Sequence, residues 1–295
     1  MLDRTARTSL TTAFVITVMC TLATQASAQD PLWGGDLVGR IDSLALASIE
    51  GGSVAALSIG VKRGGDLLLT KGYGLADIEN SVSATAETVY RIGSITKQFT
   101  AAAVMQLVEA GKIDIAASMT EYLPDYPAAG QDVTIRHLLT HTSGIKSYTG
   151  LASWAPKKTL DLSDEELVDL FKDEPVDFAP GERFLYNNSG FYLLGMIIEA
   201  VSGESYRDYL DAHVFGPLGM SRSLYCDERP IVPGRAEGYE QDGGELINAE
   251  YLSMNQPGAA GALCSTVPDL LLWTAALRSG RVVSGASYGQ MTISG

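Results

Sequence analysis

The sequence has few of the residues that most often bind metals, with three histidines and three cysteines among 295 residues. His137 and His141 stand four residues apart, a spacing that can hold zinc on one face of a helix. Residue 138 is leucine, however, where a zinc protease needs glutamate, and no cluster of cysteines or carboxylates accompanies the pair. We therefore expect neither a metal nor another cofactor.

Positive charge is also scarce. The chain has 21 lysines and arginines against 35 aspartates and glutamates, a formal net charge of −14. Such a balance argues against nucleic acid or an anionic membrane surface as a partner, because both attract basic proteins. An acidic, solvated surface is enough to explain it.

Long apolar runs are absent except at the start of the chain. Arg4 and Arg7 precede a mostly apolar stretch over 10–22, and residues 26–28 have the small side chains of a cleavage site. Residues 1–28 are therefore predicted to be a secretory signal peptide that directs the protein to the periplasm or outside the cell. The alternatives are an N-terminal membrane anchor, for which the run is short, and a lipoprotein signal at Cys20, which lacks the small preceding residue. After cleavage we expect no stable membrane span.

Two cysteines, Cys226 and Cys264, remain after the predicted cleavage. An oxidising compartment would permit a disulfide between them. The sequence does not show whether their Cα atoms lie within bridging distance, so a disulfide and two free thiols are both open.

The pattern Ser94-x-x-Lys97 places a hydroxyl and an amine one helical turn apart. A serine becomes a good nucleophile when a neighbouring base takes its proton, and residues three apart share a helix face. The apolar spacing from Ile95 to Val108, with Gly111 as a stop, predicts that helix. Ser94 is then either a nucleophile at the helix N-terminus or an ordinary N-cap serine.

Two look-alike patterns occur elsewhere. Ser143 and Lys146 have the same spacing as Ser94 and Lys97, but Gly144 and the polar residues that follow predict a loop. Residues 285–289 match the Gly-x-Ser-x-Gly elbow of α/β-hydrolases. The acid and histidine that should follow such an elbow are missing from the rest of the chain.

Tyr186-x-Asn188 is a second candidate site motif, placed between a turn at 179–182 and an apolar helical stretch at 189–203. A tyrosine hydroxyl can relay a proton when a cation stabilises its phenolate. Asn188 carries a donor and an acceptor that suit a substrate amide. The alternative is a buried tyrosine followed by an asparagine that caps the helix.

With these motifs in order, the chain resembles the serine β-lactamase-related family, which includes class C β-lactamases, D-alanyl-D-alanine carboxypeptidases and family VIII carboxylesterases. The resemblance runs from about Ser53 to about Gly280 and is carried by segments 91–115, 134–145, 178–203 and 215–220. It implies that Ser94 is an acyl-enzyme nucleophile, that Lys97 and Tyr186 transfer protons, and that Asn188 positions the substrate. β-Lactams, D-alanyl-D-alanine peptides of peptidoglycan and short esters all suit such a site.

One family feature is not found. The family carries a Lys- or His-x-Gly motif on a late strand, whereas the only Lys-x-Gly here is 62–64, ahead of the nucleophile. The resemblance thus leads us to expect a chain that is incomplete at its C-terminus, with sheet strands and one oxyanion donor missing. Losing one such donor typically costs ~10²–10³ in turnover, so a non-catalytic or crippled penicillin- or peptidoglycan-binding protein is the alternative function.

The order of elements predicts an α/β fold of the α+β type: an antiparallel sheet flanked by helices, plus a mostly helical lobe. Residues 54–63 and 66–74 read as two strands around a Gly-Gly turn. We expect one β-lactamase/transpeptidase-like domain over 29–295. Its sheet lobe would comprise 29–93 and about 255–295, and its helical lobe about 94–254.

Overall fold

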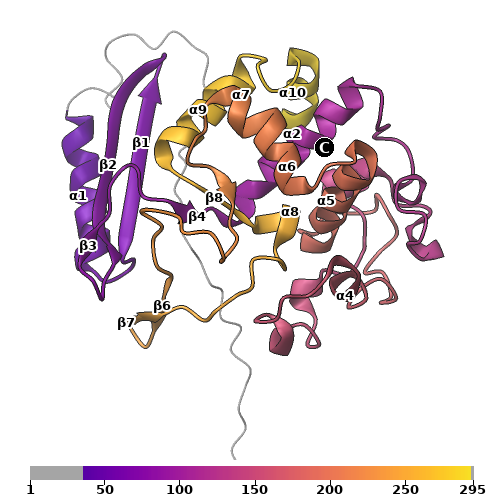
Figure 1. The fold of residues 1–295 in the computed structure, drawn as a ribbon, viewed down its shortest axis with the longest axis horizontal. Coiled ribbons are helices and arrows are strands. Elements are labelled where there is room, and N and C mark those ends of the chain that lie inside the picture. Colours follow the sequence, from indigo (N-terminus) through magenta and orange to yellow (C-terminus); the bar gives the residue numbers. More distant parts are fainter. Residues whose placement is uncertain (1–35, 294–295) are drawn as a thin grey trace, which may run out of the picture. The chain divides into compact units, whose positions relative to one another are not determined.

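A computed structural model describes residues 36–293, and their contacts form two compact units (Figure 1). The smaller unit comprises residues 36–88 and 236–249, and the larger comprises 89–235 and 250–293. Antiparallel sheets combine with many helices, as predicted.

The predicted signal peptide over 1–28 lies outside the described residues. Across 36–293, no helix has the length and apolar character that a bilayer span requires.

The smaller unit is built on a β-hairpin. Strand β1 (Ala56–Arg63) runs antiparallel to β2 (Asp66–Asp77), which also pairs with the short β3 (Val82–Ser83). Gly64 and Gly65 form the turn, with φ angles of 61° and 104°. Glycine suits both positions because other residues rarely adopt positive φ. The hairpin predicted from the sequence is therefore confirmed. The unit also contains α1 (Leu37–Glu50) and a second hairpin, β6 (Tyr239–Asp242) with β7 (Glu245–Asn248).

The larger unit has its own three-stranded antiparallel sheet, in which β8 (Leu263–Ser265) lies between β4 (Tyr90–Arg91) and β5 (Leu224–Tyr225). This pairing explains a difference from the predicted lobes. We expected residues 255–295 to belong with the N-terminal hairpin, but β8 completes a sheet inside the helical unit. A short β-strand carries no sequence signal of which strand it will pair with.

Helices form most of the larger unit. In chain order they are α2 (Thr96–Glu109), α3 (Ile135–Leu139), α4 (Asp164–Val168), α5 (Asn188–Ser202), α6 (Tyr206–Leu210), α7 (Gly216–Leu218), α8 (Gly258–Gly261), α9 (Val267–Arg278) and α10 (Gly285–Thr292). Asp211–Phe215 adds a π-helical turn after α6, and single 3-10 turns occur at Gly93–Ile95, Met119–Glu121, Ala128–Gly130, Tyr148–Gly150 and Ala155–Lys157.

Cys226 and Cys264 form a disulfide, with Cα atoms 5.2 Å apart. It joins the residue after β5 to the middle of β8, and both cysteines are fully buried. Of the two states that the sequence left open, the structure shows the disulfide.

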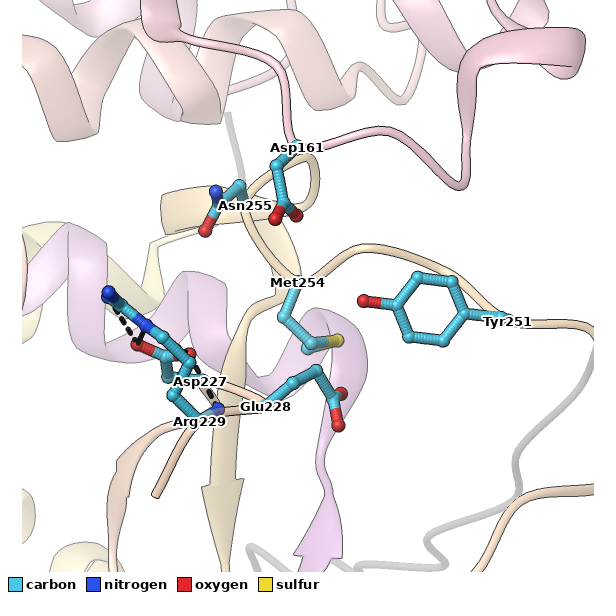
Figure 2. Close-up of a pocket in the computed structure, with 7 residues that line it drawn as sticks. All are labelled: Asp161, Asp227, Glu228, Arg229, Tyr251, Met254 and Asn255. Atoms are coloured by element: carbon cyan, nitrogen blue, oxygen red, sulfur yellow. Dashed lines mark hydrogen bonds and ion pairs between the residues drawn. The ribbon is translucent and has the colours of Figure 1, made fainter.

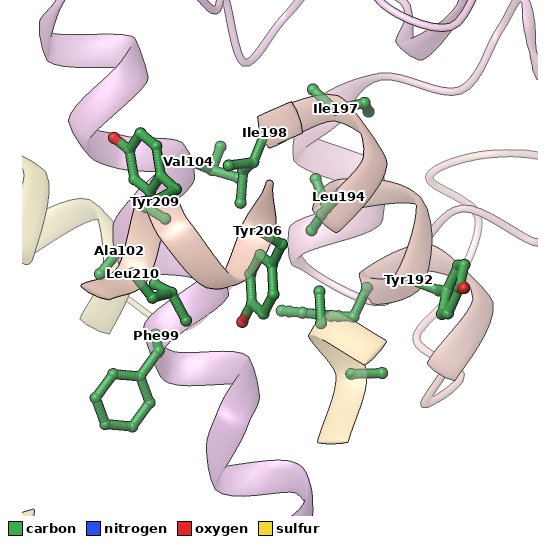
Figure 3. Close-up of a cluster of buried hydrophobic side chains, with 14 of the residues drawn as sticks. Phe99, Ala102, Val104, Tyr192, Leu194, Ile197, Ile198, Tyr206, Tyr209 and Leu210 are labelled. Atoms are coloured by element: carbon green, nitrogen blue, oxygen red, sulfur yellow. The ribbon is translucent and has the colours of Figure 1, made fainter. Parts of the chain in front are cut away.

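The core of the larger unit lies where α2, α5 and α6 pack together (Figure 3). Phe99 of α2 is fully buried and stacks on Trp273 of α9, with ring centroids 4.1 Å apart. Burying such a side chain contributes roughly 1.5–3 kcal/mol to stability. This core gives α2 a fixed position, and α2 follows directly on the turn that carries Ser94.

Helix α5 also packs closely on α8. A methyl group at Gly195 would lie 2.6 Å from the Ala259 Cβ, which is closer than carbon atoms approach. Glycine therefore sets the distance between the two helices. Gly190 on the same helix is different, because a methyl group there would lie 3.5 Å from its nearest neighbour, an ordinary contact with Leu138.

We expect Gly195→Ala to lower the free energy of unfolding by about 1–3 kcal/mol, since overpacking forces neighbouring backbone to move. Gly190→Ala is the matched control and should be neutral or stabilising by up to ~1 kcal/mol, because alanine has the higher helix propensity. Urea denaturation of both variants measures the difference. Equal midpoints for the two would mean that the α5–α8 contact is not tight.

Candidate active site

Ser94 lies in the 3-10 turn Gly93–Ile95 that joins the sheet of the larger unit to α2. The Ile92 N–H donates to the Leu263 carbonyl at 2.9 Å, which continues the β4–β8 pairing up to the turn. Ser94 itself is exposed. The sequence placed it at the first turn of an α-helix. It lies instead in a 3-10 turn that runs directly into α2, so the Ser94–Lys97 spacing of one turn is preserved.

Lys97 is buried, with only 7% of the residue exposed. Its Nζ lies 2.8 Å from the Ala260 carbonyl oxygen, 2.9 Å from Asn188 Oδ1 and 3.4 Å from Ser94 Oγ. All three oxygens are uncharged. No carboxylate within the described part of the chain forms an ion pair with Lys97.

This environment makes the amine easier to deprotonate. Burial penalises the ammonium form and lowers the pKa of Lys97 to about 7. The Nζ also lies 4.7 Å from the centre of the Tyr186 ring and 5.5 Å from that of Phe191, whose faces stabilise a cation in part. Near neutral pH a substantial fraction of Lys97 is therefore the free amine, which can accept a proton.

Tyr186 lies in the loop before α5 and approaches Ser94. Its hydroxyl is 2.6 Å from Ser94 Oγ, closer than the lysine amine. Burial raises the pKa of Tyr186, and the hydrogen bond with Ser94 opposes that shift. The phenol is thus protonated at neutral pH and can donate to Ser94 Oγ.

Asn188 is the first residue of α5, and its side chain is held at both ends. Oδ1 accepts from Lys97, and Nδ2 donates to Thr149 Oγ1 at 3.0 Å. The capping role belongs to its neighbour Asn187, whose Oδ1 accepts from the Gly190 N–H at 2.8 Å. Asn188 is therefore placed to orient the lysine amine.

The structure thus brings all four predicted site residues together, from the start of α2 with the turn before it and from the start of α5 with the loop before it. It adds two partners that the sequence analysis missed. One is the Ala260 carbonyl on α8, and a backbone oxygen leaves no side-chain signature in the sequence. The other is His141, whose ring centroid lies 4.6 Å from that of Tyr186.

The look-alike patterns do not form comparable sites. Ser143 is buried in a loop and accepts from the Ile145 N–H, while Lys146 pairs with Asp177. Ser287 is buried within α10. In neither case does a serine meet an amine or an imidazole in the way that Ser94 meets Lys97.

The two histidines of the possible zinc pattern serve different backbone groups. His137 Nδ1 accepts from the Thr134 N–H at 3.3 Å, and His141 Nδ1 accepts from the Asn187 N–H at 3.1 Å. Within residues 36–293, no group of three or more histidine, cysteine, aspartate or glutamate side chains is arranged to hold a metal.

A cavity of about 250 Å³ elsewhere in the larger unit contains none of the four predicted site residues (Figure 2). Two of its three carboxylates form ion pairs. Asp227 accepts from Arg229, which together with Arg207 holds the pKa of the carboxyl far below its usual range. Glu228 pairs with Arg91. The third carboxylate, Asp161, accepts a hydrogen bond from the Ser253 hydroxyl at 2.6 Å.

Comparison with known proteins identifies the family of this chain. The family model named Beta-lactamase matches residues 41–294. The chain belongs to the beta-lactamase family. The predicted β-lactamase/transpeptidase-like fold, with its antiparallel sheets and helices, is confirmed.

Relatives in this family differ in name and source. The putative penicillin-binding protein PbpX of Bacillus subtilis is 31% identical over 78% of this chain and 57% of its own length. The human serine beta-lactamase-like protein LACTB is 30% identical over 72% of this chain and 51% of its own. This chain therefore spans about half the length of these curated relatives.

Solved structures of family members share the fold. The octameric penicillin-binding protein homologue from Pyrococcus abyssi superposes with a TM-score of 0.75 at 35% identity, covering 88% of this chain and 60% of that one. The D-amino acid amidase from Ochrobactrum anthropi SV3 gives a TM-score of 0.75 at 27% identity, covering 86% and 73%. Serine hydrolases are thus among the relatives of this chain.

We expect the Lys97 amine to titrate near pH 7, and Asn188→Asp to raise that pKa by ~1–3 units, because a carboxylate 2.9 Å away favours the ammonium. Asn188→Ala is the uncharged control and should not raise it. NMR of ¹³Cε-labelled lysine measures the titration, with Lys97→Met identifying the signal. A wild-type signal that titrates above pH 9 would contradict the effect of burial.

Proposed function

We propose that this chain carries the catalytic machinery of a serine hydrolase that works through a covalent acyl-enzyme. The observation that carries the proposal is the position of Ser94 Oγ, 2.6 Å from the Tyr186 hydroxyl and 3.4 Å from the Lys97 amine. A serine needs a base within reach, and an amine with a pKa near 7 is available as a base at neutral pH.

In this proposal Ser94 Oγ attacks the carbonyl carbon of the substrate while the hydroxyl proton passes to the free amine of Lys97. Tyr186 and Lys97 return a proton to the leaving group when the bond to the carbonyl breaks. Water then attacks the acyl-serine, again with Lys97 and Tyr186 moving the proton. Asn188 holds the amine in place through its hydrogen bond with Lys97. In this proposal the same side chain also positions the substrate beside the amine.

The substrate class is an amide, β-lactam or ester carbonyl. Relatives named as penicillin-binding proteins and as an amidase support this range. A polar substrate such as a peptidoglycan peptide fits the same site. With the signal peptide predicted over 1–28, we place the activity in the periplasm or outside the cell.

The nucleophile is tested by incubating the full chain with a fluorophosphonate or a labelled penicillin and locating the adduct by mass spectrometry. We expect the label on Ser94 and none on Ser94→Ala, because Ser94 contacts both a base and a phenol. Ser143→Ala removes the serine of the other Ser-x-x-Lys pattern and should label like the wild type. An adduct on any other residue of the folded protein would overturn the assignment.

The same preparation discriminates among substrates. We propose a broad hydrolase or esterase activity over a dedicated β-lactamase, so p-nitrophenyl butyrate should be turned over at least as readily as nitrocefin, and Ser94→Ala should abolish turnover. Efficient hydrolysis of nitrocefin without esterase activity would reverse this preference. Equal ligand affinity and no turnover in both forms would instead indicate a penicillin- or peptidoglycan-binding protein.

A further inference from the structure

We propose that His141 is a positioning residue that holds the loop 185–187 in place, so that the Tyr186 hydroxyl meets Ser94. The inference rests on the proposed function and adds to it a side chain that touches neither Ser94 nor a substrate.

Three consecutive residues of the loop are attached to this one histidine. The Leu185 N–H donates to the His141 carbonyl at 2.9 Å, and the Asn187 N–H donates to His141 Nδ1 at 3.1 Å. Between them, the Tyr186 ring packs on the imidazole, with centroids 4.6 Å apart and planes inclined by 35°. Backbone contacts on both sides of Tyr186 and a ring contact on Tyr186 itself restrict its orientation.

The backbone of His141 is unusual in a way that fits this role. Its φ is 58°, and within residues 36–293 Ser81 is the only other non-glycine residue with positive φ. Left-handed backbone disfavours residues with a Cβ, because the Cβ comes close to neighbouring backbone atoms. Glycine would avoid that strain but would lose the hydrogen bond from Asn187 and the packing on the Tyr186 ring.

The imidazole must be neutral to accept from Asn187. Burial and, to a lesser extent, the charge of Lys97 on α2 together lower the pKa of His141 to about 4. The other groups that pack against the ring are Tyr186, Phe184 and Phe191, which carry no charge at neutral pH. While Lys97 titrates near pH 7, His141 is thus neutral, with its proton on Nε2 and its Nδ1 lone pair toward Asn187.

Two substitutions remove one contact each. His141→Asn keeps an acceptor near the position of Nδ1 and tolerates positive φ, but it has no ring to pack on Tyr186. His141→Phe keeps an aromatic ring but has no acceptor for Asn187. His137→Asn is the control, since the His137 ring accepts from the Thr134 N–H, which belongs to none of the four site residues.

If His141 acts through Tyr186, each His141 variant should lower kcat by about 10–100-fold with KM within about threefold, and the control should match the wild type. In a Tyr186→Phe background the same substitutions should cost less than about threefold, because the hydroxyl that they position is already absent. An equal fold-loss in both backgrounds, or an unchanged kcat, would overturn the proposal.

A second measurement needs no turnover and separates this inference from the proposed function. Amide hydrogen exchange at Asn187 should be faster in His141→Phe than in the wild type, and near the wild-type rate in His141→Asn. If Ser94 takes no label in the wild type, the proposed function fails while this exchange result still tests whether His141 holds the loop. Equal exchange rates in all three proteins would show that it does not.

Discussion

The ammonium form of Lys97 loses most of its hydration inside the fold, and neutral oxygens and aromatic faces replace that hydration only in part. A shift of the pKa from 10.5 to about 7 corresponds to a penalty on the order of 5 kcal/mol on the charged form. A carboxylate partner would remove the penalty and hold the proton on the amine. Its absence among the described contacts keeps the amine reactive.

This requirement determines how the surrounding helices are arranged. Lys97 comes from α2, Asn188 from the start of α5 and the Ala260 carbonyl from α8, so three helices must converge within hydrogen-bonding distance of one nitrogen. Gly195 allows α8 to approach α5. The packing of the core and the chemistry of the site are therefore parts of the same arrangement, and a change in helix spacing would move the acceptors away from the amine.

Local patterns in the sequence predicted more of this site than of the fold around it. The spacing of Ser94 and Lys97 places both on one turn because helical geometry is local, and the Gly64-Gly65 turn likewise identified the first hairpin. The approach of Tyr186 to Ser94 spans 92 residues and depends on how α5 packs, which no local pattern records. The sequence also could not predict that Asn187 caps α5 while Asn188 faces the lysine. The two asparagines are adjacent, and their side-chain directions depend on the residue at which the helix begins.

The pairing of β8 shows the same limit. A strand of three residues between β4 and β5 carries too little pattern to reveal its neighbours, so the sequence could not show that the segment around β8 lies in the larger unit. The contacts of His141 could not be predicted for a related reason. Its spacing from His137 resembled a metal site, whereas its actual contacts lie on a loop more than 40 residues further along the chain.

Whether the bond between Cys226 and Cys264 forms depends on the redox state of the compartment in which the chain folds. Disulfides form where the surroundings are oxidising, whereas thiols stay reduced in most cytosols. Protein produced in a reducing cytosol would carry two thiols in a fully buried position, out of reach of oxidants added after purification. Two preparations with the same sequence could therefore differ in how firmly β5 is held to β8, according to where the chain folded.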